Sequence, residues 1–152
     1  MKAVIQRVSE ASVAVEGKTV GACKKGYLIL LGVAEGDSEE DAELLSRKIA
    51  ALRIFQDGNG KMNLSVRDID GEILVISQFT LLADYRHGNR PDFLASAKPE
   101  EANRLYEYFK ELLRQEVRRL ESGIFGADMK VSLVNEGPVT ICMDSTVLRK
   151  KK

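Results

Sequence analysis

Apolar residues in the first half of the chain recur in the patterns of β-strands. Some segments are rich in β-branched residues or alternate apolar with small or polar residues, and Gly17 marks a turn between two of them. Others carry an uninterrupted apolar run, which is typical of a strand covered on both faces. The pattern predicts strands over residues 2–8, 13–15, 19–20, 27–33 and 72–80.

Two longer segments carry apolar residues at the three- and four-residue spacing of an α-helix. The first predicts a helix over residues 38–51, and Asp37 with Glu40 matches the pattern of a capping box. The second begins at Pro99, which can occupy the first position of a helix, and Gly123 can end it. Its apolar stripe consists of Ala102, Leu105, Tyr106, Phe109, Leu112, Leu113, Val117 and Leu120.

The end of the chain returns to strand patterns, and the complete order of elements indicates a fold class. We predict strands over residues 130–134 and 139–143, joined by a turn at 135–138. Strands, helix, strands, helix and strands follow one another without strict βαβ alternation. This order favours an α+β fold, with a largely antiparallel curved sheet or β-barrel-like core and two main helices packed outside. We expect residues 1–148 to form a single domain and residues 149–152 a basic tail.

Composition and charge exclude several kinds of binding site and segment. Lys and Arg together number 23, as do Asp and Glu, so bulk charge cannot bind nucleic acid, although a local basic patch can. The single histidine, His87, and two cysteines are too few for a multi-histidine metal site or a zinc site, and we expect no metal or cofactor. No apolar run approaches the ~20 residues of a membrane span. The first residues do not match a signal peptide, which favours the cytoplasm.

A polar interruption follows the apolar run at residues 73–76. Ser77, Gln78, Phe79 and Thr80 place two hydroxyls and an amide at the predicted end of a core strand. A strand end or bulge leaves consecutive backbone N–H groups free, and such groups can hold a developing oxyanion. The alternative is that Ser77 and Thr80 bond to neighbouring backbone where the strand ends.

A second interruption lies at Gly137, Pro138, Val139 and Thr140. Glycine removes side-chain bulk and proline removes a backbone donor. Such a pair is usual in a turn at a hairpin tip. It is also suited to a close approach of backbone to a ligand.

The two interruptions occur together in a known family. Residues 76–81 (ISQFTL) and 135–140 (NEGPVT) resemble the paired signature of D-aminoacyl-tRNA deacylases, formerly called D-tyrosyl-tRNA deacylases. Shorter matches follow one another along nearly the whole chain, and their order and spacing make the resemblance specific. They lie at residues 5–8, 11–13, 31–33, 53–55, 60–63, 90–91 and 125–129.

The resemblance implies a homodimeric hydrolase with a β-barrel-like fold. It implies hydrolysis of the ester between a D-amino acid and the 3′-terminal adenosine of tRNA, a proofreading step that recycles the tRNA, and removal of glycine mischarged onto tRNA. It also implies that the Gly137–Pro138 bond is cis and projects from one subunit into the pocket of the other, where main-chain atoms act as a chiral filter. Arg7 resembles the family arginine that holds this segment, and Val139 and Thr140 support it.

Two versions of catalysis remain open. In the first, Thr80 is a nucleophile that forms an acyl-enzyme, although a threonine hydroxyl needs a base and neither motif supplies one. In the second, backbone N–H groups around Gln78 and Phe79 stabilise the oxyanion, and the ribose 2′-hydroxyl of the substrate helps to activate water. Ser77 and Thr80 then orient the substrate. The resemblance favours the second version.

The resemblance also suggests contacts with the tRNA. Phe125 and Met129 are candidates for packing against the terminal adenine, although their pattern alone indicates core packing. A basic lip formed by Arg86, Arg90 or the tail can meet phosphates, and binding should then weaken with salt.

Two rival functions remain. A nucleic-acid-binding or replication-associated module would keep the fold without turnover and would bind DNA even after loss of Thr80 or of the Gly137–Pro138 tip. A general esterase would cleave small esters that lack adenosine. The intact pair of motifs favours the deacylase over both.

Overall fold

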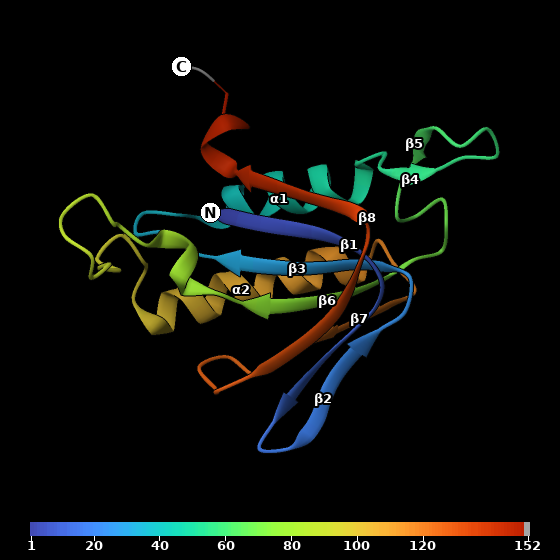
Figure 1. Ribbon diagram of the computed structural model, residues 1–152. Helices are drawn as coiled ribbons and strands as arrows, with labels where there is room; N and C mark the ends of the chain where they lie inside the picture. The colour runs from blue at the N-terminus through green and yellow to red at the C-terminus, as the bar shows by residue number, and fades with distance from the viewer. Residues whose placement is uncertain (151–152) are drawn as a thin grey trace.

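The computed structural model describes residues 1–150, so Lys151 and Lys152 of the predicted basic tail lie outside the described residues. Figure 1 shows a strongly curved sheet with two α-helices lying together along one part of it. The strands are β1 (Lys2–Val15), β2 (Lys18–Cys23), β3 (Gly26–Gly32), β4 (Phe55–Gln56), β5 (Met62–Leu64), β6 (Glu72–Ser77), β7 (Arg119–Ser122) and β8 (Lys130–Asp144). The helices are α1 (Glu39–Ala51), α2 (Pro99–Arg114) and the short 3₁₀ helices η1 (Phe79–Leu82) and η2 (Ser145–Val147).

The long strand β1 organises the main sheet, whose order is β2-β1-β3-β6-β7 with β8 on the other side of β1. Residues 2–8 of β1 pair with β3, residues 11–15 pair with β2, and β8 follows β1 along most of its length, all antiparallel. The pairs β3–β6 and β6–β7 are parallel, because α1 and α2 each return the chain to the same end of the sheet. The Glu121 side chain of β7 accepts a hydrogen bond from the Ala22 N–H of β2 at 3.0 Å, which nearly closes a barrel. The predicted α+β class with a barrel-like sheet and two outer helices is confirmed.

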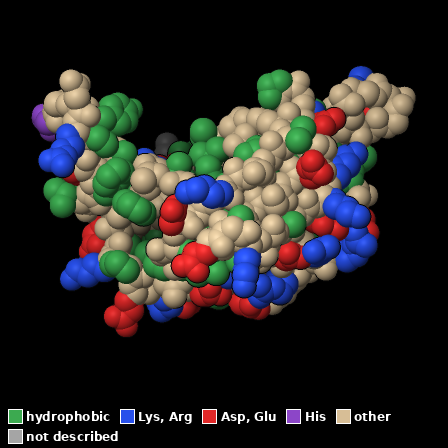
Figure 2. Space-filling model, turned by 60° about the horizontal axis from the view of Figure 1, so that its bottom comes forward, with side chains coloured by type: hydrophobic (Ala, Val, Ile, Leu, Met, Phe, Trp, Pro, Cys, Tyr) green, Lys and Arg blue, Asp and Glu red, His purple; other side chains and the backbone are tan. Residues whose placement is uncertain are grey.

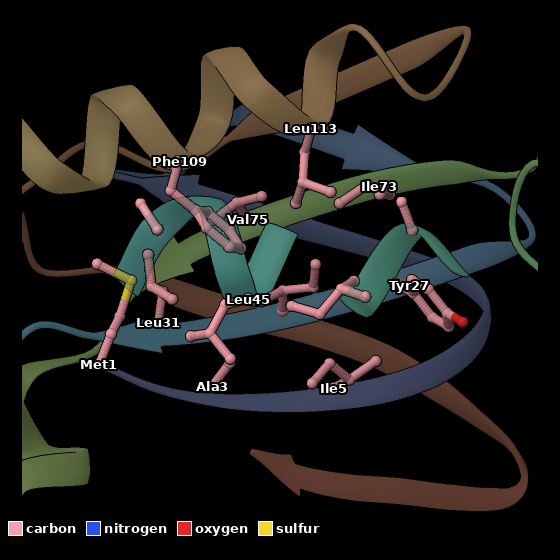
Figure 3. Packing of buried hydrophobic residues seen from close by; sticks show 14 of the residues in the cluster. Met1, Ala3, Ile5, Tyr27, Leu31, Leu45, Ile73, Val75, Phe109 and Leu113 are labelled. Carbon is pink, nitrogen blue, oxygen red and sulfur yellow. The ribbon is translucent and has the colours of Figure 1, made fainter. Parts of the chain in front are cut away.

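The core has two parts because the central strands face apolar surroundings on both sides. Leu45 of α1 and Phe109 of α2 point toward the sheet, where Ile73, Val75 and Leu31 receive them (Figure 3). On the opposite face a second cluster fills the interior of the curved sheet. Strands β3 and β6 are therefore buried almost throughout, which confirms the prediction from their apolar runs. The second cluster consists of Val8, Ala11, Val13, Cys23, Leu28, Leu74 and Ile76.

The second helix is shorter than its apolar stripe predicted. Helix α2 ends at Arg114, and Leu120 lies in β7, where it pairs with Ile73 of β6. The side chain of Leu120 is buried in the same core as the helix, so the helical spacing continued by coincidence across a change of element. The predicted end at Gly123 was therefore wrong.

The two strands predicted near the C-terminal end are one. Strand β8 runs over 15 residues and stays paired with β1, although the register shifts on both sides of Val8. Residues 135–138 form a bulge within this strand and not the turn of a hairpin. Proline is tolerated here because β8 is an edge strand.

Helix α1 starts with a capping box one residue later than predicted, in which the Ser38 N–H donates to Asp41 Oδ2 at 2.9 Å. Asp37 is instead used to join the chain ends, since its carboxylate lies 2.6 Å from the Met1 ammonium and 3.3 Å from Arg149 Nη2. Arg149 also lies 2.7 Å from the Asp41 carboxylate. The first residue of the predicted tail is thus anchored to the fold. Among residues 1–150, no helix is long and apolar enough to cross a membrane.

Candidate functional site

A cleft of about 720 Å³ opens at the end of β6. Parallel strands β3 and β6 deliver their carboxyl ends to it, and η1, the start of α2 and two loops complete its walls. It collects Ser77, Gln78 and Phe79 of the first motif, while Thr80 is exposed just beyond it. Phe125 and Met129 also line it, so the structure brings them together with the first motif.

Two unpaired backbone donors lie where the first motif enters the cleft, one on a lining residue and one just beyond it. The Gln78 N–H donates to the Leu31 carbonyl at 2.8 Å, which extends the β3–β6 pairing beyond the strand. The N–H groups of Phe79 and Thr80 have no partner among residues 1–150, as expected for the first residues of a helix. The available pair is therefore Phe79 and Thr80, and the predicted inclusion of the Gln78 N–H was wrong because that group belongs to the sheet.

A glycine allows η1 to lie this close to β3. A Cβ at Gly32 would stand 2.9 Å from the Gln78 carbonyl oxygen and 2.6 Å from the Leu82 side chain. A larger residue would push the turn and its two free N–H groups away from the strand. No local pattern in the sequence predicts this contact, because Gly32 lies far from the first motif along the chain.

The side chains of the first motif are tied to one another and to the cleft wall. The Gln78 amide donates to Thr80 Oγ1, and neither the Ser77 hydroxyl nor the Thr80 hydroxyl bonds to neighbouring backbone among the described residues. The alternative structural interpretation of these two hydroxyls was therefore wrong. The Phe79 ring, 56% exposed, meets Phe93 edge to face with 5.1 Å between the ring centroids.

The second motif is an exposed bulge held from behind by Arg7. The peptide bond between Gly137 and Pro138 is cis, as the resemblance implied, and Gly137 has a φ of 124°. Buried Arg7, 8% exposed, donates from Nε to the Glu136 carbonyl at 3.0 Å and from Nη1 to the Ile54 carbonyl at 2.7 Å. A Cβ at Gly137 would lie 2.7 Å from Arg7 Nη2. The backbone angle and the arginine both require glycine here.

Sequence reasoning missed the residues that brace the bulge from the side. Asn135 Nδ2 donates to Gln6 Oε1 at 2.8 Å and to Thr140 Oγ1 at 3.0 Å, and Asn135 Oδ1 accepts from the Val139 N–H at 3.2 Å. The amide thus replaces ladder bonds that the bulge removes. A polar Gln6 within an apolar strand segment was the available signal.

Within one chain the two motifs lie apart. Gly137 lines a separate hollow of about 310 Å³, together with Arg7 and Phe55, and none of its lining residues lines the cleft. In Figure 1 the bend of β8 and the helix η1 lie at opposite ends of β3 and β6. A direct action of Gly137 and Pro138 on a molecule in the cleft therefore requires a second copy of the chain.

The cleft offers main-chain and neutral polar groups, and two charged residues, Lys98 and Asp128, also line it. Among the described residues, no three His, Cys, Asp or Glu side chains come together as a metal site. The fold and this cleft define a class of small α+β barrels whose site is built on the end of a buried parallel strand. The sequence profile of the D-Tyr-tRNA(Tyr) deacylase family matches residues 4–144, and the chain belongs to this family.

Individual relatives agree with this assignment. A D-aminoacyl-tRNA deacylase of Thermotoga petrophila is 57% identical over 148 residues, covering 97% of this chain and 99% of that protein. A solved structure titled c-Myc DNA Unwinding Element Binding Protein is 44% identical with a TM-score of 0.90, covering 95% of this chain and 98% of the other. A structure described as a probable eukaryotic D-amino acid tRNA deacylase shares the fold, with a TM-score of 0.79 at 17% identity over 93% of this chain and 97% of the other.

Proposed function

We propose that this protein hydrolyses the ester that joins a D-amino acid, or mischarged glycine, to the 3′-terminal adenosine of tRNA. The observation that carries the proposal is the pair of unpaired N–H groups at Phe79, which lines the cleft, and at Thr80, which follows it at the rim. Relatives at 49–57% identity are named D-aminoacyl-tRNA deacylases. We also propose that the reaction takes place in the cytoplasm and that residues 1–148 act as one domain.

The reaction needs few protein groups. Water attacks the ester carbonyl, and the N–H groups of Phe79 and Thr80 donate to the oxygen that gains negative charge. The ribose 2′-hydroxyl positions the water and helps to move its proton to the departing 3′-oxygen. The products are a free amino acid and a tRNA with its 3′-hydroxyl restored. Because an aminoacyl ester is already activated, positioning and oxyanion stabilisation suffice.

Thr80 acts in this scheme through its backbone and as an orienting group. Its Oγ1 accepts from the Gln78 amide, which is not a base, and no titratable side chain contacts it among residues 1–150. A threonine nucleophile needs a base to take its proton. Ser77, at the end of β6, orients the substrate from the cleft wall.

Selection against L-amino acids comes from a second copy of the chain in a homodimer. The exposed Gly137–Pro138 bulge is rigidly backed by Arg7, Val139 and Thr140 and lies away from its own cleft. Placed over the cleft of a partner, a backbone wall beside the α-carbon excludes an L side chain and tolerates most D side chains. Glycine has no side chain to clash, so its ester is also cleaved.

Phe125 and Met129 hold the adenine ring. Both are half-buried and line the cleft together with Phe79, and Phe125 also contacts Tyr106, with 6.0 Å between ring centroids. Apolar walls with a few polar groups are typical of sites for flat heterocycles.

Hydrolysis of D-tyrosyl-tRNA beside L-tyrosyl-tRNA and glycyl-tRNA tests the proposal, with equal enzyme and no added metal. Rapid loss of the D-ester and of glycyl-tRNA is expected, with the L-ester intact. Equal loss of the D- and L-esters would contradict the proposed chiral selection. If no ester is lost, the proposed deacylase activity is contradicted.

One observation favours a second candidate. The 44% identical structure carries a title that names binding to a DNA unwinding element. A binding module predicts salt-sensitive DNA binding by this protein that persists in Thr80→Val and Gly137→Ala variants, without turnover of any aminoacyl-tRNA. The same preparations therefore decide between the two.

A further inference from the structure

A stiff loop rises from the rim of the cleft. Asp84 and Asp92 exchange backbone hydrogen bonds of 2.8 and 3.0 Å, which close the neck of a loop formed by residues 85–91, here called the tip loop. Below the neck, the Ala97 N–H donates to the Val33 carbonyl at 3.0 Å, so the base of the loop is fixed to the end of β3. Figure 1 shows the tip loop projecting beyond the sheet.

The tip loop exposes cations and an aromatic ring. All of residues 85–91 are exposed, and Tyr85 is 77% exposed with no packing partner to explain its ring. Arg86, His87 and Arg90 lie on the tip loop, which contains no carboxylate. Figure 2 shows a projection at one edge of the molecule that carries basic, histidine and hydrophobic side chains. Stacking rings interleaved with cations are how proteins hold single-stranded nucleic acid.

The two arginines of the tip loop differ in their hydrogen-bond partners. Arg86 Nε lies 2.9 Å from the Asp84 carboxylate, and the hydrogen bonds from Arg86 lower the pKa of Asp84 to about 2. Asp84 therefore stays charged and holds Arg86 in one orientation. The Arg90 guanidinium has no hydrogen-bond or ion-pair partner among residues 1–150. Arg90 is thus available to an external anion.

The base of the loop is continuous with the cleft. Phe93, Leu94 and Lys98 follow the neck and line the cleft beside Phe79. Leu94 is 87% exposed, and hydrophobic side chains gather at the foot of the projection in Figure 2. This wall therefore connects the cleft to the tip loop.

We propose that the tip loop is the docking site for the acceptor end of the tRNA, with the Tyr85 ring stacking on a base and Arg90 binding a backbone phosphate. This inference rests on the proposed function, because it assigns the 3′-terminal adenosine to the cleft. It gives a chain of zero net charge a local site for a polyanion. Arg86 contributes a second, pre-oriented cation.

The experiment compares two substrates that share the ester and differ in the nucleic acid. D-Tyrosyl-tRNA reaches the tip loop, whereas D-tyrosyl-adenosine fills only the cleft. Tyr85→Ala and Arg90→Gln should each lower kcat/KM for the tRNA roughly tenfold and leave kcat/KM for the adenosine ester unchanged. Arg90→Gln should also reduce the salt dependence of binding to uncharged tRNA by about one phosphate contact.

Two control variants test whether the losses come from the ring and the charge of the tip loop and not from substitution in general. Tyr85→Phe keeps the ring and should behave as wild type. Arg47→Gln removes an exposed cation from α1, away from the cleft, and should also behave as wild type.

Three results would overturn the tip-loop assignment. They are equal losses on both substrates, wild-type behaviour of Tyr85→Ala and Arg90→Gln on tRNA, or conversion of the protein to monomers in sedimentation, which would assign the loop to contacts between copies. If wild type cleaves neither substrate, the proposed deacylase fails, and the affinity for uncharged tRNA still decides whether the loop binds nucleic acid.

Discussion

Two segments of the molecule present main-chain atoms to their surroundings, and they are held in opposite ways. The N–H groups of Phe79 and Thr80 follow a strand buried on both faces, and the backbone bond from Gln78 to Leu31 fixes them. The Gly137–Pro138 bulge lies on an edge strand, and side chains reaching from Arg7 and Asn135 fix it. The conformation of the first segment should therefore tolerate substitution of its side chains. The conformation of the second segment should depend on the side chains that hold it.

The largest effect on activity is expected from a substitution that removes a main-chain donor from the first segment. Phe79→Pro deletes one of the two free N–H groups, and proline is tolerated at the first position of a helix. Gln78 lies at φ −143° and ψ 82°, outside the helical region that a following proline disfavours. Loss of one oxyanion donor should lower kcat for D-tyrosyl-tRNA roughly 10²- to 10³-fold.

The matched control is Phe79→Ala, which keeps the N–H group and loses only the ring contact with Phe93. Single-turnover rates of the two variants on D-tyrosyl-tRNA measure the difference. Equal rates for the proline and alanine variants would show that this N–H group takes no part in the reaction.

The next largest effect should be a loss of selectivity, caused by a substitution in the second segment. Gly137→Ala places a Cβ 2.7 Å from Arg7 Nη2 at a φ of 124°, and such strain costs about 1–3 kcal/mol. Displacement of the bulge should lower the ratio of D- to L-tyrosyl-tRNA cleavage by roughly 10- to 100-fold. Gly58→Ala is the control, because a Cβ there meets nothing within 4 Å. A normal ratio in Gly137→Ala would remove the bulge from chiral selection.

A smaller loss of selectivity is expected from Asn135→Ala. It leaves the Val139 N–H without its partner and removes one hydrogen bond each from the side chains of Gln6 and Thr140, which still contact each other at 3.4 Å. A neutral hydrogen bond contributes about 1 kcal/mol, so the D-to-L ratio should fall roughly fivefold. Asn59→Ala, at an exposed turn, should change nothing. If selectivity is unchanged while Tm falls, Asn135 supports the fold and not the filter.

The smallest effect on activity should come from a site remote from both segments. Burial by itself raises the pKa of Asp41, but hydrogen bonds from Ser145, the Ser38 backbone and Arg149 outweigh it and lower the pKa. A lowered carboxyl pKa gives stability that is complete above the unfolded value of about 3.9 and is lost as pH falls through the folded value.

Asp41→Asn should therefore be less stable than wild type at neutral pH and lose less stability on acidification. Its activity and selectivity at neutral pH should remain unchanged. Thermal unfolding between pH 7 and pH 3 measures the first expectation, and an identical pH dependence in both proteins would contradict it.

The sequence could predict what depends on neighbours along the chain. The apolar runs identified β3 and β6, whose two buried faces need no polar positions. It could not predict which N–H groups are free, because the Gln78 donor is taken by Leu31, a residue of another strand. For the same reason residues 135–138 suggested a hairpin turn, since local pattern does not reveal that β1 continues alongside them.

The central claim is that the cleft of one chain works with the bulge of another. A heterodimer of differently tagged subunits tests it directly, with Phe79→Pro in one subunit and Gly137→Ala in the other. The Gly137→Ala subunit keeps an intact cleft, and the Phe79→Pro subunit keeps an intact bulge. These two meet in one site only if the cleft of one subunit faces the bulge of the other. The account predicts that it cleaves D-tyrosyl-tRNA selectively, while neither parent homodimer does. A heterodimer no more selective than the Gly137→Ala homodimer would contradict the account.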